Sequence, residues 1–347
     1  MNPKILKYLV CPTCREPLKL KSEKMLKLKI KESTLVCRGS HKFKIKKFVP
    51  RLLRGRINSL QKQTGESFAK KWGRQPWWGL KGGTKSFFRK WFLERYGWND
   101  EKTFKKFISS KEMILDAGTG LGREVVNCCK FTKGEVFGVE ISDCVENAYV
   151  NTKDYPNAHI IQADITRLPF EKNMFDFILS EGVLHHTPDT KKSFEYLVPY
   201  LKKRGEIAIY VYKKKGPIRE FCDERIRKYT TKLSAEKCWE FCKRFTKLGK
   251  SLSELDMEIE VPDNLPQFKI EAGKYDLQRF IYWNALKCFW NADLSFDENN
   301  LVNFDWYHPK YAHRHSLDEV KRWFKESGLK IAHFHVDNSG ITARGVK

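Results

Sequence analysis

The 347 residues contain 66 lysines and arginines and 42 aspartates and glutamates, so the formal net charge at pH 7 is +24. Hydrophobic residues make up 41% of the chain and charged residues 31%, which is typical of a folded globular protein and excludes a disordered or collagen-like one. Charged residues interrupt every long apolar stretch, and the first residues lack the apolar core of a signal peptide. We therefore expect no membrane span and a cytoplasmic protein.

The excess positive charge lies almost entirely in the first third of the chain. Residues 1–110 hold 29 basic and 7 acidic side chains, a balance of +22, whereas residues 111–347 hold 37 and 35. A basic arm on a nearly neutral body is expected of a protein that binds a polyanion such as RNA. A solvated, lysine-rich surface explains the same numbers, and composition alone leaves both interpretations open.

The first 56 residues contain a candidate metal site. Cys11 and Cys14 form a Cys-x2-Cys pair, and Cys37 and His41 offer two further ligands, a donor set that suits a tetrahedral zinc ion. Between the pairs, apolar residues alternate with lysines, which predicts short, half-exposed strands. Because so few apolar residues cannot stabilise a fold alone, we predict that residues 1–56 form a module held together by structural Zn²⁺.

This segment resembles the zinc ribbons, Trm112-like ones among them, that precede some methyltransferases, including a form with Cys-x2-Cys followed by Cys-x3-His. Other versions carry a second Cys-x2-Cys pair, but Ser40 stands at that position here, so the site depends on His41 as its fourth ligand. The remaining seven cysteines lack ligand spacing and are expected to be small buried hydrophobic residues.

From residue 111 onward, short apolar strands alternate with helical segments. This alternation predicts an α/β fold with a doubly wound parallel sheet, whose core we place at residues 111–212. In such sheets, ligands bind beyond the carboxyl ends of the strands. The five candidate strands are residues 113–115, 136–139, 160–161, 175–179 and 207–211.

Polar residues and glycines follow the first three of these strands. The first strand leads into Asp116 and a glycine-rich turn, the second ends at Glu140, and the third ends near Asp164. A dinucleotide-binding fingerprint would need its third glycine one position later, where Arg123 stands. Glycines in such a turn let a ligand approach the backbone closely. They are Gly118, Gly120 and Gly122.

This combination resembles the class I S-adenosylmethionine (SAM)-dependent methyltransferases, whose sheet is Rossmann-like. The resemblance implies SAM as cofactor, with the glycine turn facing its methionine part and Glu140 accepting hydrogen bonds from both ribose hydroxyls. It also implies that Asp164 and Ile165 contact the adenine, and that residues 180–189 line the sulfonium and the substrate entrance. The implied cofactor-binding residues are Asp116, Gly118, Gly120, Gly122, Glu140, Asp164, Ile165 and Glu181.

Two adjacent histidines, His185 and His186, lie in this last segment. Either could act as a general base, because an imidazole titrates near neutral pH. Either could instead only shape the loop beneath the cofactor. Methyl transfer to an already nucleophilic atom depends mainly on proximity and orientation, so a base is not obligatory.

About 100 residues separate the fifth strand from a C-terminal helix and strand pair, which we assign to residues 316–347. This insertion, residues 213–315, is largely helical by pattern and begins and ends beside the strand ends, so we predict that it forms a substrate lid. Its last stretch crowds titratable groups into a loop that returns to the pocket. These candidate substrate contacts are Asp305, Tyr307, His308 and His313.

The segment before the core, residues 57–110, combines aromatic and basic residues at helical spacing. Such a surface can stack bases and hold phosphates. The same rings can instead pack against the core, and in many methyltransferases a preceding helical segment covers the bound cofactor. The pattern alone does not distinguish these roles.

We expect a methyltransferase that transfers the methyl group of SAM to an oxygen, nitrogen or carbon nucleophile of a small molecule, such as a glycan or a lipid-linked precursor. The alternative acceptor is a ribosomal or transfer RNA base, with the RNA docked on the basic first third. The chain lacks the motifs of adenine N6 and cytosine C5 methylation, which disfavours those two bases. A third possibility is a non-catalytic partner protein that binds SAM.

Overall fold

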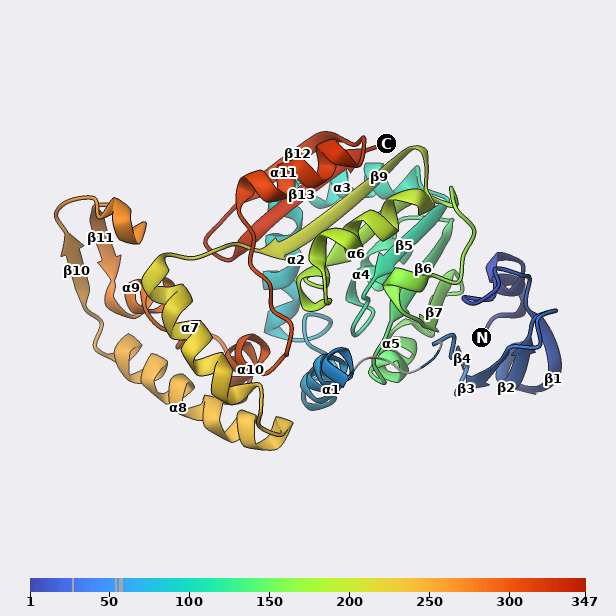
Figure 1. The fold of residues 1–347 in the computed structure, drawn as a ribbon, viewed down its shortest axis with the longest axis horizontal. Coiled ribbons are helices and arrows are strands. Elements are labelled where there is room, and N and C mark those ends of the chain that lie inside the picture. Colours follow the sequence, from blue (N-terminus) through green and yellow to red (C-terminus); the bar gives the residue numbers. More distant parts are fainter. Residues whose placement is uncertain (27, 54, 56–58) are drawn as a thin grey trace.

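A seven-stranded mixed sheet forms the centre of the computed structural model, which describes residues 1–26, 28–53, 55 and 59–347 (Figure 1). The strand order is β12-β13-β9-β8-β5-β6-β7. Strands β5 to β9 are parallel to one another, β13 runs antiparallel to β9, and β12 runs antiparallel to β13. This arrangement confirms the predicted doubly wound, Rossmann-like sheet. The strands are β5 (Met113–Ala117), β6 (Glu135–Glu140), β7 (Ala158–Gln162), β8 (Phe175–Glu181), β9 (Leu201–Tyr212), β12 (Lys330–Val336) and β13 (Gly340–Val346).

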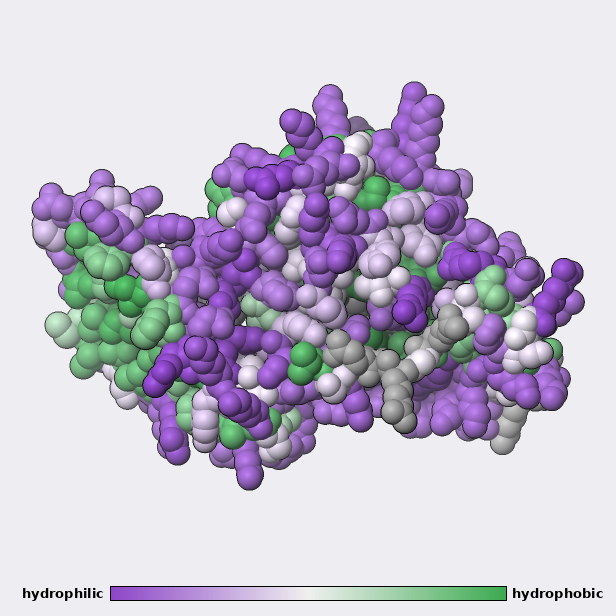
Figure 2. Space-filling model, viewed as in Figure 1, coloured by the Kyte–Doolittle hydropathy of each residue, from purple (hydrophilic) through white to green (hydrophobic). Residues whose placement is uncertain are grey.

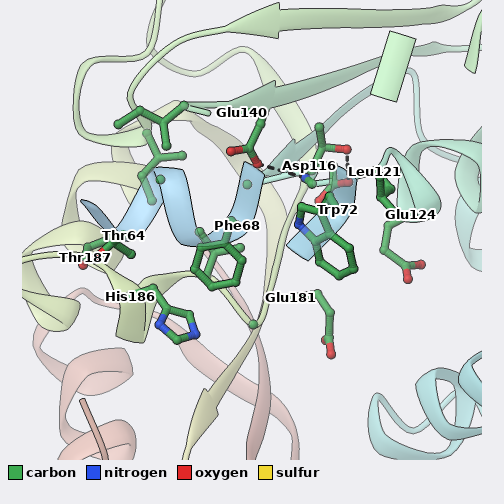
Figure 3. Close-up of a pocket in the computed structure, with 18 of the residues that line it drawn as sticks. Thr64, Phe68, Trp72, Asp116, Leu121, Glu124, Glu140, Glu181, His186 and Thr187 are labelled. Carbon is green, nitrogen blue, oxygen red and sulfur yellow. Dashed lines mark hydrogen bonds between the residues drawn. The ribbon is translucent and has the colours of Figure 1, made fainter. Parts of the chain in front are cut away.

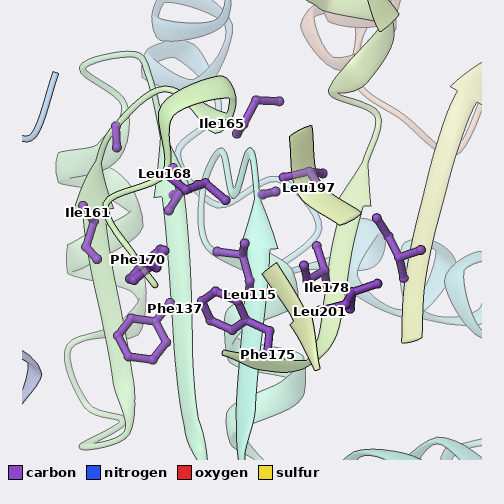
Figure 4. Packing of buried hydrophobic residues seen from close by; sticks show 14 of the residues in the cluster. Leu115, Phe137, Ile161, Ile165, Leu168, Phe170, Phe175, Ile178, Leu197 and Leu201 are labelled. Carbon is purple, nitrogen blue, oxygen red and sulfur yellow. The ribbon is translucent and has the colours of Figure 1, made fainter. Parts of the chain in front are cut away.

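Neighbouring residues of the strands bury their side chains on opposite faces of the sheet. Leu115 and Phe137 lie in one cluster, which α6 and α11 complete (Figure 4), and Ile114 and Val136 lie in the other, with α2 to α5. Because both faces are covered, the central strands are nearly continuous runs of apolar residues. The helices are α2 (Gly83–Arg95), α3 (Glu101–Ser109), α4 (Arg123–Cys129), α5 (Val145–Thr152), α6 (Thr190–Leu197) and α11 (Leu317–Glu326), with the short helices η2 (Ile165–Arg167), η3 (Leu184–His186) and η4 (Val198–Tyr200).

The order of the strands fixes where a ligand can bind. The chain runs outward from β5 through β6 to β7, then returns to β8 on the other side of β5. Connections that leave in opposite directions open a crevice at the carboxyl ends of the two central strands. Asp116 in β5 and Glu181 at the end of β8 lie at this crevice.

A small N-terminal module lies against the free edge of β7 (Figure 1). Its antiparallel sheet continues into Arg51, which forms a bridge with Gln162, and the Leu52 N–H donates to the Gln162 carbonyl at 2.7 Å. Arg15 donates to the carbonyls of Leu168, at 2.7 Å, and Phe170. The module therefore covers a sheet edge that would otherwise be unpaired. Its elements are η1 (Pro3–Tyr8), β1 (Lys19–Leu26), β2 (Lys29–Val36), β3 (Lys42–Lys46) and β4 (Val49–Pro50).

The predicted boundary between this module and the next segment, at residues 56 and 57, lies outside the described residues. The chain is described again from α1 (Ser59–Arg74), which packs against α8 (Ala235–Glu254) and α10 (Phe296–Tyr307) of the insertion. Trp78, in the turn after α1, belongs to the same buried cluster as Trp239 and Phe304.

The insertion is mainly helical, as its pattern predicts, and it also contains a two-stranded hairpin that the pattern did not indicate. Asp305 and Tyr307 lie on a helix, not in the predicted loop. A capping box between Ser295 and Glu298 starts that helix, and it ends before Pro309. The elements are α7 (Pro217–Thr230), α8 (Ala235–Glu254), β10 (Glu258–Val261), η5 (Pro266–Phe268), β11 (Gly273–Asp276), α9 (Leu277–Asn284) and α10 (Phe296–Tyr307).

Figure 2 shows a largely hydrophilic surface with a group of apolar side chains at the left, over the insertion. None of the described helices combines the length and apolar composition that crossing a membrane requires. The exposed apolar residues of the insertion include Ile218, Phe221, Leu248, Leu255, Met257, Leu265 and Phe268.

Candidate active site

The turn after β5 is built for close approach to the backbone. Gly118 and Gly120 have positive φ angles of 91° and 52°, a region that side chains other than glycine rarely adopt. A Cβ atom on Gly118 would lie 2.3 Å from a methyl carbon of Val183, and one on Gly120 would lie 3.2 Å from Nε1 of Trp72. Only glycine therefore fits the first position without rearrangement.

Two buried carboxylates flank this turn (Figure 3). Asp116 accepts a hydrogen bond from the Thr119 hydroxyl at 2.7 Å, and Glu140 accepts from the backbone N–H groups of Gly120, at 3.0 Å, and Ser142, at 2.9 Å. Burial raises the pKa of Asp116 to about 7 and also raises the pKa of Glu140. Both side chains are thus held in place by neutral donors, with no cation paired to them among the described residues.

The third strand end supplies Asp164, which accepts from the N–H and hydroxyl of Thr166 at 2.8 Å and from Gln61 at 3.4 Å. Ile165 follows it, is buried and lines the same pocket. The Gln61 contact comes from α1, so a helix before the core reaches the third strand end.

Glu181 lines the same pocket and lies away from Glu140, at the lower side of the view in Figure 3. The Tyr96 hydroxyl donates to it, and the guanidinium of Arg95 lies 3.7 Å from its second oxygen. Burial raises the pKa of Glu181, while Arg95 and the hydroxyl of Tyr96 act in the opposite direction. The side chain therefore sits in a protected and well-oriented position beside the glycine turn.

Seven of the eight predicted cofactor residues line this one pocket; the exception is Gly122, which caps the start of α4 and packs against Thr152. Helix α1 closes the pocket with residues that the sequence analysis did not assign to it individually, although it considered such a cover. Figure 3 shows the rings of Phe68 and Trp72 among the carboxylates and His186. The α1 residues in the wall are Gln61, Thr64, Gly65, Phe68 and Trp72.

The two histidines occupy different environments. His186 lines the pocket, and its Nδ1 lies 2.7 Å from the Tyr311 carbonyl; because a carbonyl only accepts, this nitrogen carries the proton. Burial lowers the pKa of His186 to about 4, so the ring is neutral near pH 7. His185 is fully buried outside the pocket wall, with its ring centroid 3.8 Å from that of Tyr212. Only His186 can reach a ligand in this structure.

The four candidate substrate contacts are not brought together at the pocket. Asp305 lines an adjoining cavity, where it pairs with Lys71 at 3.0 Å. Tyr307 is fully buried in the insertion, and the Nδ1 atom of His308 lies 2.7 Å from the Ser67 hydroxyl. The Nε2 atom of His313 lies 3.1 Å from the carbonyl of Thr187. Asp305 alone therefore faces an open space.

In the N-terminal module, the four predicted metal ligands converge. The Sγ atoms of Cys14 and Cys37 are 3.5 Å apart, and Nδ1 of His41 lies 3.3 Å from Cys37 Sγ and 3.7 Å from Cys11 Sγ. Tetrahedral zinc with Zn–S bonds of about 2.3 Å separates two sulfurs by about 3.8 Å, so this set fits the ion. Ser40 is exposed, with a φ of 60°, and forms the turn that brings His41 inward.

A backbone hydrogen bond from Glu16 lowers the pKa of the Cys14 thiol to about 6, which favours the thiolate form that binds metal. Among the described residues, these four are the only ones that form such a cluster.

The chain is similar to known methyltransferases. Residues 108–277 match the family model of a methyltransferase domain. The sterol 24-C-methyltransferase of Kluyveromyces lactis is 20% identical over 238 residues, covering 65% of this chain and 54% of the relative. The demethylmenaquinone methyltransferase of Staphylococcus saprophyticus is 29% identical over 119 residues, covering 33% and 51%. A solved SAM-dependent methyltransferase from Aquifex aeolicus matches 73% of this chain and 91% of its own, with 16% identity and a TM-score of 0.38.

The chain spans about half the length of the curated relatives it matches. The matched segment contains strands β5 to β9, the glycine turn and the acidic strand ends described above. Residues 108–277 therefore form a methyltransferase domain, and its sheet has the class I, Rossmann-like strand order.

Proposed function

We propose that this protein transfers the methyl group of SAM to a small-molecule acceptor. The observation that carries the proposal is that the acidic pocket at the strand ends meets a larger cavity beneath the insertion, with Phe68, Trp72, Glu181 and His186 in the walls of both. A cofactor in the first space and an acceptor in the second would be neighbours, which is the main requirement of methyl transfer.

The residues at the strand ends suit the parts of SAM. The bare backbone at Gly118 and Gly120 leaves room for the methionine part, and the two oxygens of Glu140 suit the two ribose hydroxyls. Asp164 and Ile165 would hold the adenine, as the family resemblance implies. When bound, SAM supplies a methyl group on a positively charged sulfur, and the surrounding carboxylates favour a cation there.

The acceptor space favours a small molecule over a polymer. Its volume is about 790 Å³, within the range of about 300–1,000 Å³ for small-molecule sites, and the insertion covers it. The relatives named above are methyltransferases of a sterol and of demethylmenaquinone, and both acceptors are small molecules.

Within this site, we assign to His186 the role of proton acceptor. Its Nδ1 proton is committed to Tyr311, so the neutral ring has its lone pair on Nε2. A carbonyl that fixes the tautomer orients the ring as well. His185, buried against Tyr212, would keep this segment in position and contact no ligand.

To test the proposal, the purified chain is incubated with methyl-labelled SAM and, separately, with the metabolite fraction and the RNA fraction of a cell extract. We expect label in a small molecule and stoichiometric formation of S-adenosylhomocysteine with the metabolite fraction alone. Label confined to RNA would show that the acceptor is RNA and not a small molecule. Binding of SAM without turnover in either fraction would point to a non-catalytic partner protein.

For the N-terminal module, we propose that Cys11, Cys14, Cys37 and His41 hold a structural Zn²⁺. Because the module has a small core, metal binding should contribute directly to its folding. Metal analysis of freshly purified protein should give one zinc per chain, and Cys14→Ser should lose it and melt at a lower temperature. Cys222→Ser, on α7, is the matched control and should retain the metal. Absence of zinc from both the parent chain and Cys222→Ser would contradict the assignment.

A further inference from the structure

The cavity beneath the insertion carries buried lysines in its wall. Lys215 stands just before α7 and is 8% exposed, and Lys287 follows α9 and is 6% exposed. Within the described part of the chain, neither Nζ has a carboxylate oxygen within 4.0 Å. By contrast, Lys71 in the same wall pairs with Asp305 at 3.0 Å. Two lysine side chains are thus buried without a carboxylate partner.

The contacts that these lysines do make are with neutral groups. Lys287 Nζ donates to the Tyr282 hydroxyl at 3.4 Å, and Lys215 Nζ donates to the carbonyls of Asn338 and Ser339. Burial lowers the pKa of Lys287 to about 7 and the pKa of Lys215 well below its usual value. Removing an ammonium group from water costs free energy, and a hydrogen-bonded counterion offsets part of that cost. An anion in the cavity would be such a counterion.

Aromatic rings lie near both ammonium groups. Lys287 Nζ lies 4.6 Å and Lys215 Nζ 5.8 Å from the ring centroid of Trp306, and Lys215 Nζ is 5.3 Å from the ring of Trp283. Both tryptophans line the cavity, so their faces offer an apolar surface next to the cations. A ligand that fills this space would need an anionic end and an apolar or planar body.

We propose that the acceptor bears a phosphate or carboxylate group that contacts Lys215 and Lys287, and an apolar part that packs against Trp283 and Trp306. That the bound anion is the methyl acceptor rests on the proposed function, but binding of an anion to this cavity can be measured without methyl transfer. It narrows the substrate from any small molecule to an amphipathic organic anion.

The test is calorimetry of the full chain with three probes that share one ring: phenyl phosphate, benzoate and neutral benzyl alcohol. We expect at least one of the two anions to bind at least tenfold more tightly than benzyl alcohol. Preference for phenyl phosphate assigns a phosphate to the acceptor, and preference for benzoate assigns a carboxylate. Equal affinity for all three probes, or no binding of either anion, overturns the proposal.

Variants locate the site. Lys287→Gln should weaken binding of the preferred anion at least tenfold, and Lys287→Arg should largely restore it because the charge is kept. The matched control is Lys192→Gln, a lysine outside both cavities with a 71% exposed side chain, which should change the affinity less than twofold. An unchanged affinity in Lys287→Gln overturns the assignment.

SAM titrated into the same proteins separates the two proposals. Lys287→Gln should bind SAM within twofold of the parent chain, since Lys287 does not line the cofactor pocket. If the anion binds but SAM does not, the proposed function fails while the anion site stands. If SAM binds but the anions do not, the anion site fails while the proposed function stands.

Discussion

The two adjoining cavities differ in charge. The pocket at the strand ends, which we propose holds SAM, contains five carboxylates and a single basic side chain, Arg123, whereas the cavity beneath the insertion contains six basic side chains and three carboxylates. The acidic residues of the first are Asp116, Glu124, Glu140, Asp164 and Glu181, and the basic residues of the second are Lys71, Lys90, Arg123, Lys215, Arg219 and Lys287. A sulfonium cation and an anionic acceptor would each be favoured in one space and disfavoured in the other, so charge alone would sort the two ligands.

The difference has an origin in the chain. Four of the five carboxylates stand on or just after strands of the sheet and Glu124 stands on α4, whereas Lys215, Arg219 and Lys287 come from the insertion. The carboxylates of the first cavity thus come mainly from the sheet, whereas the wall of the second is formed by α1, α2 and the insertion together. A change of acceptor would therefore involve α1 and α2 as well as the insertion.

The largest effect is expected when the acidic pocket is altered. Glu140→Ala removes a carboxylate that is positioned by Gly120 and Ser142 and should weaken SAM binding at least 100-fold, because hydrogen bonds to a charged group contribute about 1.5–3 kcal/mol each. Calorimetry with SAM measures this directly. Binding of phenyl phosphate should stay within twofold, since Glu140 does not line the second cavity.

Glu254→Ala, an exposed carboxylate on α8, is the control for loss of one negative charge and should bind SAM normally. If Glu140→Ala and the control bind SAM equally well, the glutamate plays no part in the site, and the contrast between the cavities has no functional meaning for the cofactor.

How far the sequence predicts this architecture depends on the cavity. The strand-end acids and the glycine turn follow a fixed order along the chain, and parallel strands bring their carboxyl ends to one edge, so the sheet and the grouping of these residues could be predicted. The convergence of Cys11 and His41 on one point likewise follows from two short turns joined by a strand pair. Local spacing is sufficient in both cases.

The second-largest effect concerns the wall between the cavities. His186→Gln removes the proposed proton acceptor, whose loss should lower kcat about 10- to 100-fold while the affinity for SAM stays within twofold. A merely structural role would instead change SAM affinity or the melting temperature. The control is His333→Gln, whose Nε2 contacts the Arg95 carbonyl away from both cavities and which should retain turnover. Equal turnover in His186→Gln and the parent chain removes the histidine from the reaction.

The acceptor cavity could not be predicted in the same way. Asp305 and Tyr307 were expected in a returning loop, but a capping box extends α10 through both, so Tyr307 turns into the core. Lys287, which the sequence analysis did not single out, is separated from Lys215 by 72 positions and meets it only through tertiary packing. One signal was available in the sequence. Lys287 stands between the apolar residues Ala285-Leu286 and Cys288-Phe289-Trp290, and a lysine within such an apolar run indicates a buried charged group.

The smallest expected effect is a pH dependence of anion binding. Lys287 has a pKa of about 7 in the free protein, because burial outweighs the favourable charges around it. Below pH 7 the amine is already protonated and binds the anion directly; above pH 7 the proton must be taken up on binding. The dissociation constant for phenyl phosphate should therefore rise by up to about tenfold per pH unit above 7. The charged and titratable groups around Lys287 are Lys71, Lys215, Arg219, Asp223, Tyr282, Cys288 and Asp305.

Lys287→Arg provides the contrast for this measurement, because a guanidinium stays protonated throughout. Its affinity should vary less between pH 6 and 9 than that of the parent chain, and the remaining variation would come from Lys215, whose pKa burial also lowers. Titrations in buffers of different ionisation enthalpy should show less proton uptake near pH 8 in the variant than in the parent chain. A parent chain whose affinity follows pH in the same way as that of Lys287→Arg would mean that another basic side chain of the cavity binds the anion and that Lys287 is buried for packing alone.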